Sequence, residues 1–115
     1  MQFALLIYNP DGNVTKPVND DFKKAQAAYM AFTEALKKSN GYIASHGLSA
    51  SSSATTVRVR DGKSQVLNGP YADSKEQLGG IYVIEVPDLD AALSWAARCP
   101  SANWGVIEVR PMWGQ

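Results

Sequence analysis

The sequence predicts an α+β fold in which two helices cover one face of a mostly antiparallel sheet. Three observations lead to this prediction. Short apolar, strand-like runs alternate with two amphipathic segments, an Asp-Gly pair separates two β-branched segments, and each helical segment lies between strands. The chain has 115 residues, which suits one domain spanning residues 1–115.

The first strand is predicted from Phe3 to Tyr8, because this run is apolar on both faces and ends at an Asn-Pro-Asp-Gly turn signal. A helix follows, with Asn19 or Asp20 as its cap and Asn40-Gly41 as its end. Its apolar residues recur at steps of three and four and form one stripe: Phe22, Ala25, Tyr29, Phe32 and Leu36.

The middle of the chain predicts a second strand, a connector and a hairpin. The strand runs from Tyr42 to Leu48, and the exposed, Ser-rich connector runs from Ser49 to Thr56. The segments 56–60 and 64–67 flank Asp61-Gly62, a pair that readily takes the positive φ angles of a two-residue hairpin turn.

A strand at 81–86, a helix starting at Pro87-Asp88 and a strand at 104–110 complete the chain. The apolar stripe of this helix is predicted to be Leu89, Ala92, Leu93 and Ala96. The order is therefore β-α-β-(hairpin)-β-α-β, which is the ferredoxin-like plan.

The second face of the predicted sheet is too apolar for a monomer. Two helices cover only one face, and Ile81, Val83 and Val106 join the apolar first strand on the other. This pattern predicts a homodimer packed through that face. The alternative is that the hairpin or the segment 111–113 folds back over it.

Composition argues against several classes of function. Lys plus Arg equals Asp plus Glu at 11 each, so the chain lacks the basic footprint of a nucleic-acid-binding protein. One histidine and one cysteine, Cys99, predict no metal site, and Gly79-Gly80 lacks the spacing of a phosphate-binding loop, so no cofactor is expected. The N-terminal apolar run is too short for a signal peptide or a membrane span, which predicts a cytoplasmic protein.

The segment from Asn68-Gly69-Pro70-Tyr71 through Gly79-Gly80 to the strand at 81–86, with the Ala-rich helix behind it, resembles the DGPF-motif branch of the YCII-related family. The resemblance covers essentially the whole chain. It implies a ferredoxin-like member of the dimeric α+β barrel superfamily. The family has no well-established reaction, and its association with sigma-factor regulatory genes implies a sensing or accessory role.

His46 is the candidate catalytic residue, because it is the only side chain whose unperturbed pKa lies near neutrality. It could act as a general base or acid, or simply lie on the surface. Related proteins use a histidine and an aspartate as a suspected acid–base pair, and the resemblance places that aspartate at Asn68. An amide has no ionisable carboxylate, so Asn68 could orient a ligand but could not be a base.

The candidate ligand-binding residues surround the same turn: Asn68, Tyr71, Lys75 and Glu76. Lys75 could neutralise a small anion beside the Gly-rich stretch. The leading prediction is a small homodimer that binds a polar or anionic metabolite in a cleft near this turn. One alternative is an enzyme that performs proton transfer or a lactone-type isomerisation with His46 as base. Another is a protein-interaction module.

Overall fold

The computed structural model describes residues 1–10, 12 and 22–115. It confirms the predicted order of elements. Four strands form one antiparallel sheet in the order β2-β5-β1-β6, and β3 and β4 form a separate hairpin. The elements are β1 Gln2–Pro10, α1 Phe22–Lys38, β2 Tyr42–Gly47, a 3₁₀ turn Ser51–Ser53, β3 Thr55–Arg60, β4 Lys63–Asn68, β5 Glu76–Glu85, α2 Leu89–Arg98, a 3₁₀ turn Pro100–Asn103 and β6 Val106–Pro111.

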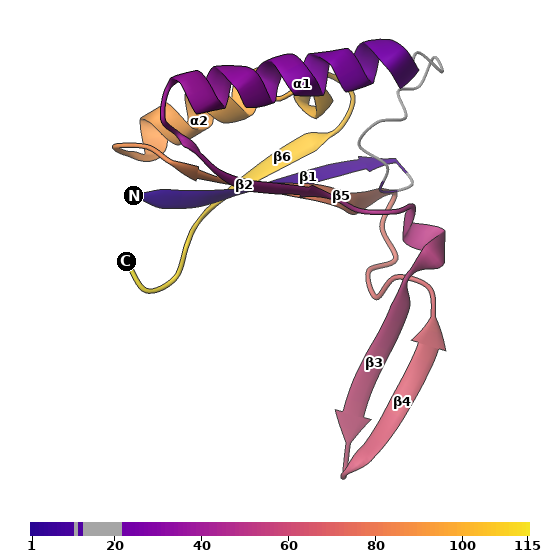
Figure 1. The fold of residues 1–115 in the computed structure, drawn as a ribbon. Helices are drawn as coiled ribbons and strands as arrows, with labels where there is room; N and C mark the ends of the chain where they lie inside the picture. The colour runs from indigo at the N-terminus through magenta and orange to yellow at the C-terminus, as the bar shows by residue number, and fades with distance from the viewer. Residues whose placement is uncertain (11, 13–21) are drawn as a thin grey trace.

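Both helices lie on one face of the four-stranded sheet, and the core is the layer between them (Figure 1). The first strand and the first helix supply much of it through the periodicities that the sequence predicts. These buried residues are Phe3, Leu5 and Ile7 from β1 and Ala25, Tyr29, Phe32 and Leu36 from α1. The predicted cap at Asn19 or Asp20 and the side chain of Phe22 lie outside the described residues.

The second helix is rotated relative to its predicted stripe. Ala92 and Ala96 are buried, but Leu89 and Leu93 are about half exposed. Trp95 takes their place: it packs against the core with its ring edge-to-face to that of Phe32, at a centroid distance of 6.0 Å. An indole buries more apolar surface than a leucine side chain, so the rotation that turns Trp95 inward is favoured.

Strand β5 begins at Glu76, five residues earlier than the prediction of 81–86. The extra residues pair with the end of β1 across a β-bulge between Ile7 and Tyr8. Gly79 makes the close approach feasible, because a Cβ there would lie 2.7 Å from the carbonyl oxygen of Gly12. The residues expected in a loop at 76–80 therefore form a strand.

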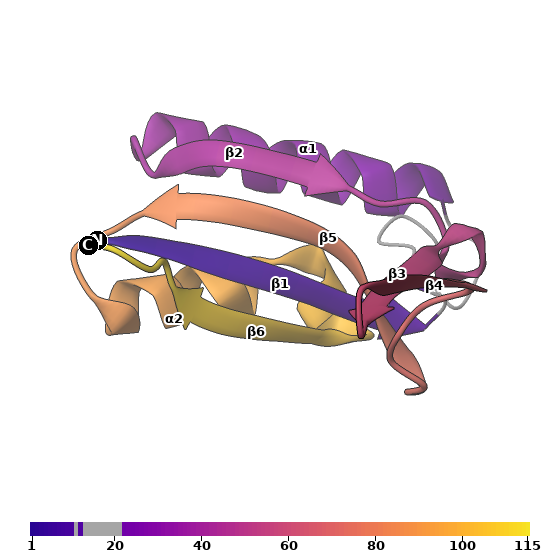
Figure 2. The same ribbon diagram turned by 90° about the horizontal axis from the view of Figure 1, so that it is seen from below.

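The predicted hairpin is present, with positive φ angles of 52° at Asp61 and 74° at Gly62. It projects away from the sheet, on the side opposite the helices (Figures 1 and 2). We refer to residues 55–68 as the arm. It leaves and rejoins the body of the protein at a single point, where the Gly69 amide donates a hydrogen bond of 2.7 Å to the Ala54 carbonyl.

The sheet face opposite the helices is called the open face. Strand register assigns to it Ala4, Leu6 and Tyr8 of β1, Ile81 and Val83 of β5, Ala44 and His46 of β2, and Val106, Glu108 and Arg110 of β6. No helix or strand of the described chain crosses this face in Figure 1. The C-terminal segment does not pack on this face through Trp113 either, because the side chain of Trp113 is fully exposed.

Candidate functional site

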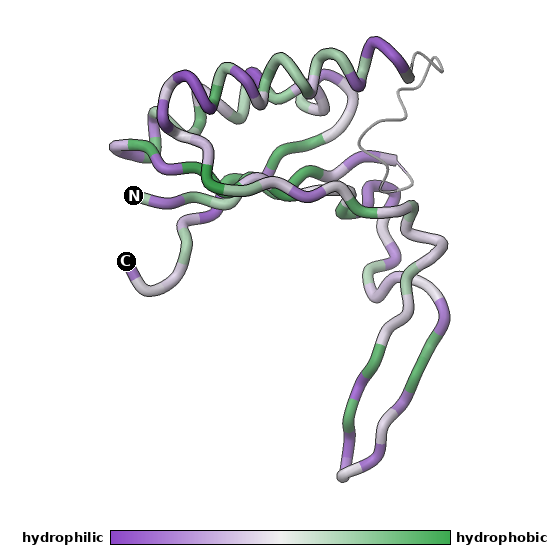
Figure 3. The backbone as a smooth tube through the Cα atoms, viewed as in Figure 1, coloured by the Kyte–Doolittle hydropathy of each residue, from purple (hydrophilic) through white to green (hydrophobic). Residues whose placement is uncertain are grey.

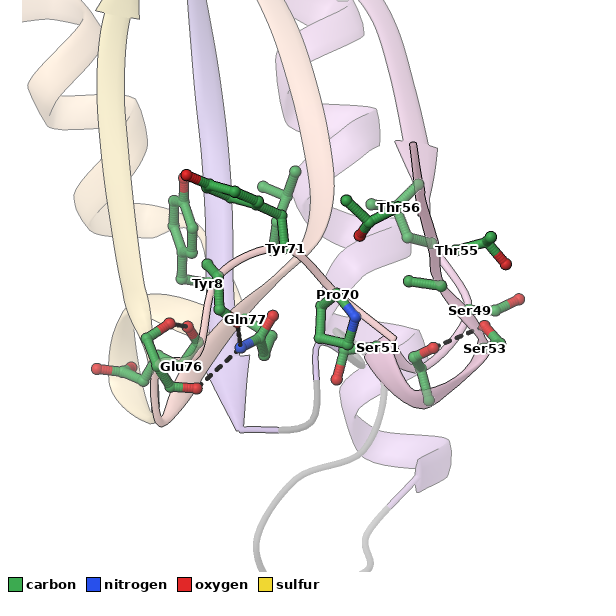
Figure 4. Close-up of a pocket in the computed structure, with 16 residues that line it drawn as sticks. Tyr8, Ser49, Ser51, Ser53, Thr55, Thr56, Pro70, Tyr71, Glu76 and Gln77 are labelled. Atoms are coloured by element: carbon green, nitrogen blue, oxygen red, sulfur yellow. Dashed lines mark hydrogen bonds between the residues drawn. The ribbon is translucent and has the colours of Figure 1, made fainter. Parts of the chain in front are cut away.

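A pocket of about 570 Å³ lies where the root of the arm meets the end of the sheet (Figure 4). Three parts of the chain enclose it: the end of β1, the Ser-rich connector with the start of β3, and the segment from the turn after β4 into β5. The lining residues are Tyr8, Leu48, Ser49, Ala50, Ser51, Ser53, Ala54, Thr55, Thr56, Pro70, Tyr71, Ala72, Ser74, Glu76, Gln77 and Leu78. Tyr8 and Leu78 are cross-strand partners, so the pocket adjoins the open face.

One wall is held by hydrogen bonds from hydroxyl groups to backbone carbonyls. The Thr56 hydroxyl donates to the Gly69 carbonyl at 2.8 Å and so ties β3 to the turn after β4. The Ser53 hydroxyl donates to the Ala50 carbonyl at 2.7 Å and stabilises the 3₁₀ turn of the connector. The connector that the sequence predicts to be exposed is thus part of the wall.

The opposite wall is held by Gln77. Its side-chain amide donates to the carbonyls of Ala72 and Ser74, at 2.8 and 2.9 Å, while its own backbone belongs to β5. The Ser74 hydroxyl donates to the Glu76 carbonyl at 2.6 Å. These three bonds fix the short loop that leads into β5.

Two tyrosines supply the aromatic surface of the pocket (Figure 4). Tyr8 is half-buried in the sheet, whereas Tyr71 is 77% exposed and lies with its ring centroid 5.9 Å from the Arg58 guanidinium. An aromatic ring this exposed has a face free for a ligand or a second protein surface.

The charges that line the pocket disfavour an anionic ligand. Among its described lining residues, Glu76 alone carries a formal charge, and the other polar groups are hydroxyls and one amide. No lysine or arginine of the described chain lines it, and the nearest cation described above is Arg58, which lies over the Tyr71 ring.

Two of the five predicted site residues line the pocket, and the other three do not. Tyr71 and Glu76 line the pocket together. Asn68 is the exposed last residue of β4, and Lys75 is exposed beside the pocket without lining it. His46 is exposed on edge strand β2, opposite Ile81 on the open face.

Sequence reasoning missed Tyr8 and the hydroxyl-bearing wall of the connector. Tyr8 reaches the pocket through its pairing with Leu78, a contact between residues far apart in the chain. The density of serine and threonine at 49–56 was the available signal, but it also fits an exposed connector.

Cys99 belongs to the hydrophobic core. It is fully buried, and burial raises the pKa of its thiol, which therefore stays protonated and unreactive. In the described part of the chain, His, Cys, Asp and Glu do not gather in any group of three or more that could hold a metal ion. Neither described helix has the length and apolarity needed to cross a membrane.

The chain matches the family model of the YCII-related domain over residues 1–114. The protein belongs to the YCII-related family. An uncharacterized protein of Rhizobium meliloti is 35% identical to this YCII-related protein over 119 residues, covering 97% of this chain and 92% of the relative.

A solved structure has a similar fold: the 5-chloro-2-hydroxyhydroquinone dehydrochlorinase of Burkholderia phenoliruptrix, in complex with 2,5-dihydroxybenzoquinone. The TM-score is 0.54 at 18% sequence identity, and the match covers 100% of this chain and 95% of that one. At this identity the likeness establishes the shared α+β fold of the YCII-related protein.

Proposed function

We propose that this YCII-related protein is a homodimer that binds a small, uncharged, hydroxylated organic molecule in the pocket at the root of the arm. The observation that carries the proposal is the chemistry of the lining. Hydroxyl groups, one amide and two tyrosine rings converge on a space of about 570 Å³. That volume falls within the usual range for small-molecule sites, roughly 300–1,000 Å³.

The chemical groups that line the pocket indicate the class of ligand. A planar oxygenated ring would lie against Tyr8 or Tyr71, and its oxygens would meet the serine and threonine hydroxyls. The structural neighbour is solved with 2,5-dihydroxybenzoquinone, which is a planar oxygenated ring. An anionic ligand, the other prediction from sequence, has less support, because Lys75 lies outside the lining.

The dimer is supported by the open face. Leu6, Ile81 and Val83 place apolar side chains at its centre, and a second copy packed about 10 Å away would remove them from water. The free thiol of Cys99 is compatible with the reducing cytoplasm, the location we propose. A sensing or accessory role is the biological context we propose for ligand binding.

An enzymatic role with His46 as general base is the second candidate. The observation in its favour is that His46 is exposed on the open face, where it could exchange protons with a substrate. It ranks second because His46 does not line the pocket. A protein-interaction module would use the open face without the pocket.

The test is a thermal-shift screen with hydroxylated benzenes and benzoquinones, run on the wild type and three variants. A ligand at 100-fold its Kd stabilises the native state by roughly 2.7 kcal/mol. We expect a shift for the wild type and for His46→Ala, and a reduced shift for Tyr71→Ala and Thr56→Val. A hit that His46→Ala abolishes would favour the enzyme instead, and turnover of that hit would then be measured. No shift with any compound would contradict the proposed ligand class.

A further inference from the structure

The arm presents a bare apolar face. Strand register places Val57, Val59 and Val66 together on one side, with Val57 directly opposite Val66. These side chains are 62%, 55% and 62% exposed. The other side carries Arg58 opposite Gln65 and is more polar. Figure 3 shows the hydrophobic stretches on both strands of the projecting arm.

The body of the same chain does not cover this face. The described contacts between arm and body lie at the root, where Thr56 and Gly69 make their hydrogen bonds. A two-stranded hairpin is at best marginally stable by itself in water. We therefore expect the apolar face of the arm to pack against a surface of another molecule.

The arm is long enough to reach a second copy of the chain packed on the open face. Each strand of the arm has six residues and spans about 20 Å, whereas two sheets packed face to face lie about 10 Å apart. The arm projects on the side of the open face. It would therefore extend past the sheet of a facing copy and lie along its flank.

The area needed for a stable dimer also favours a contact between the arm and a second copy. Strands β2 and β6 have six residues each, β1 has nine and β5 has ten. At about 3.3 Å per residue and about 4.8 Å between strands, the open face has a footprint of about 500 Å². A stable interface buries about 800 Å² per partner. Each copy would give one arm face, about 200 Å², and receive another, which brings the footprint to about 900 Å² per copy.

We infer that the arm clasps a second copy of this chain through Val57, Val59 and Val66, and that this contact holds the pocket wall in place. The root of the arm is the wall: Thr55 and Thr56 belong to β3, and Tyr71 follows β4 by three residues. The arm-root wall of the pocket is then held less firmly in a monomer. The inference rests on the homodimer of the proposed function.

The test is the double variant Val57→Glu/Val66→Lys. It removes the apolar face but keeps the hairpin, because it places opposite charges directly across the two strands. Gln65→Glu is the matched control, since it adds a carboxylate opposite Arg58 on the other side of the same arm. Analytical ultracentrifugation across a concentration series gives the dimer dissociation constant, and hydrogen exchange reports on the wall segments 48–56 and 70–78.

We expect the double variant to raise the dissociation constant at least about 100-fold, because four buried valines are lost per dimer. The wall segments should exchange faster in it, while Gln65→Glu resembles the wild type in both measurements. An unchanged dissociation constant would overturn the clasp and leave a dimer formed by the open face alone. Dissociation without faster exchange would overturn the link to the pocket. A monomeric wild type would overturn both the clasp and the proposed homodimer, whatever the ligand screen shows.

Discussion

The hydroxyl groups of Tyr29 and Ser101 share a hydrogen bond in the core, between α1 and the turn that follows α2. Cys99 lies at the same point, with its sulfur 3.6 Å from the Tyr29 oxygen. Ser101 and Cys99 are fully buried, so water cannot replace a lost partner. These contacts join α1 to the turn after α2 through a small polar cluster.

Tyr29→Phe should lower the free energy of unfolding by about 1–2 kcal/mol, because it leaves the Ser101 hydroxyl without its buried partner. Urea denaturation monitored by circular dichroism measures the change. Tyr71→Phe is the matched control, since that hydroxyl belongs to a side chain that is 77% exposed. Equal stability of the two variants would show that the buried bond contributes nothing.

Stability should fall in alkaline solution. Burial raises the pKa values of Tyr29 and Tyr82 above 10.0 and that of Cys99 above 9.0. The native state therefore keeps protons that the unfolded chain releases, and its stability is fully present below these reference values and lost as pH rises beyond them. The free energy of unfolding, measured from pH 8 to 11, should decline from about pH 9. The decline should be shallower in Tyr29→Phe, and a flat profile in the wild type would contradict the buried positions of these groups.

Gly105→Ala should destabilise the fold by more than about 2 kcal/mol, because the added Cβ would lie 2.1 Å from the backbone oxygen of Tyr8. Gly62→Ala is an informative comparison. Gly62 has a φ of 74° but open space around it, so only backbone strain of about 1 kcal/mol is expected. If chemical denaturation ranks the two variants in the opposite order, the close approach of 105 to β1 is not as described.

Gln77→Leu should loosen the loop at 72–74, since it removes both hydrogen bonds that the side-chain amide donates. We expect faster hydrogen exchange in this loop and weaker ligand binding, with a loss of global stability of about 1 kcal/mol or less. Lys75→Ala serves as control, because its side chain is exposed and does not line the pocket. Similar exchange in the two variants would show that Gln77 does not organise this wall.

The fold followed from the sequence because its signals are local. Steps of three and four predict the buried face of α1, and Asp61-Gly62 predicts the hairpin turn. The predictions were wrong where contacts between residues far apart in the chain determine the structure. Glu76 and Gln77 carry no strand signal but pair with β1, and Trp95 turns α2 because Phe32 lies across from it.

The candidate site was less predictable for the same reason. Tyr71 and Glu76 line the pocket and lie near the turn on which the prediction rested. Tyr8 joins them only through the pairing of β1 with β5, and the hydroxyls of the connector only through the fold of the arm root. The roles predicted for His46, Asn68 and Lys75 stay predictions.

The arm joins the rest of the protein at one point, where Ala54 and Gly69 share a hydrogen bond. The arm and the four-stranded sheet can therefore change independently of each other. Lengthening or shortening the chain between 55 and 68 leaves the pairing of all four sheet strands intact. The length of the arm can therefore change during evolution without refolding the core. Members of the family should differ in length mainly within this segment.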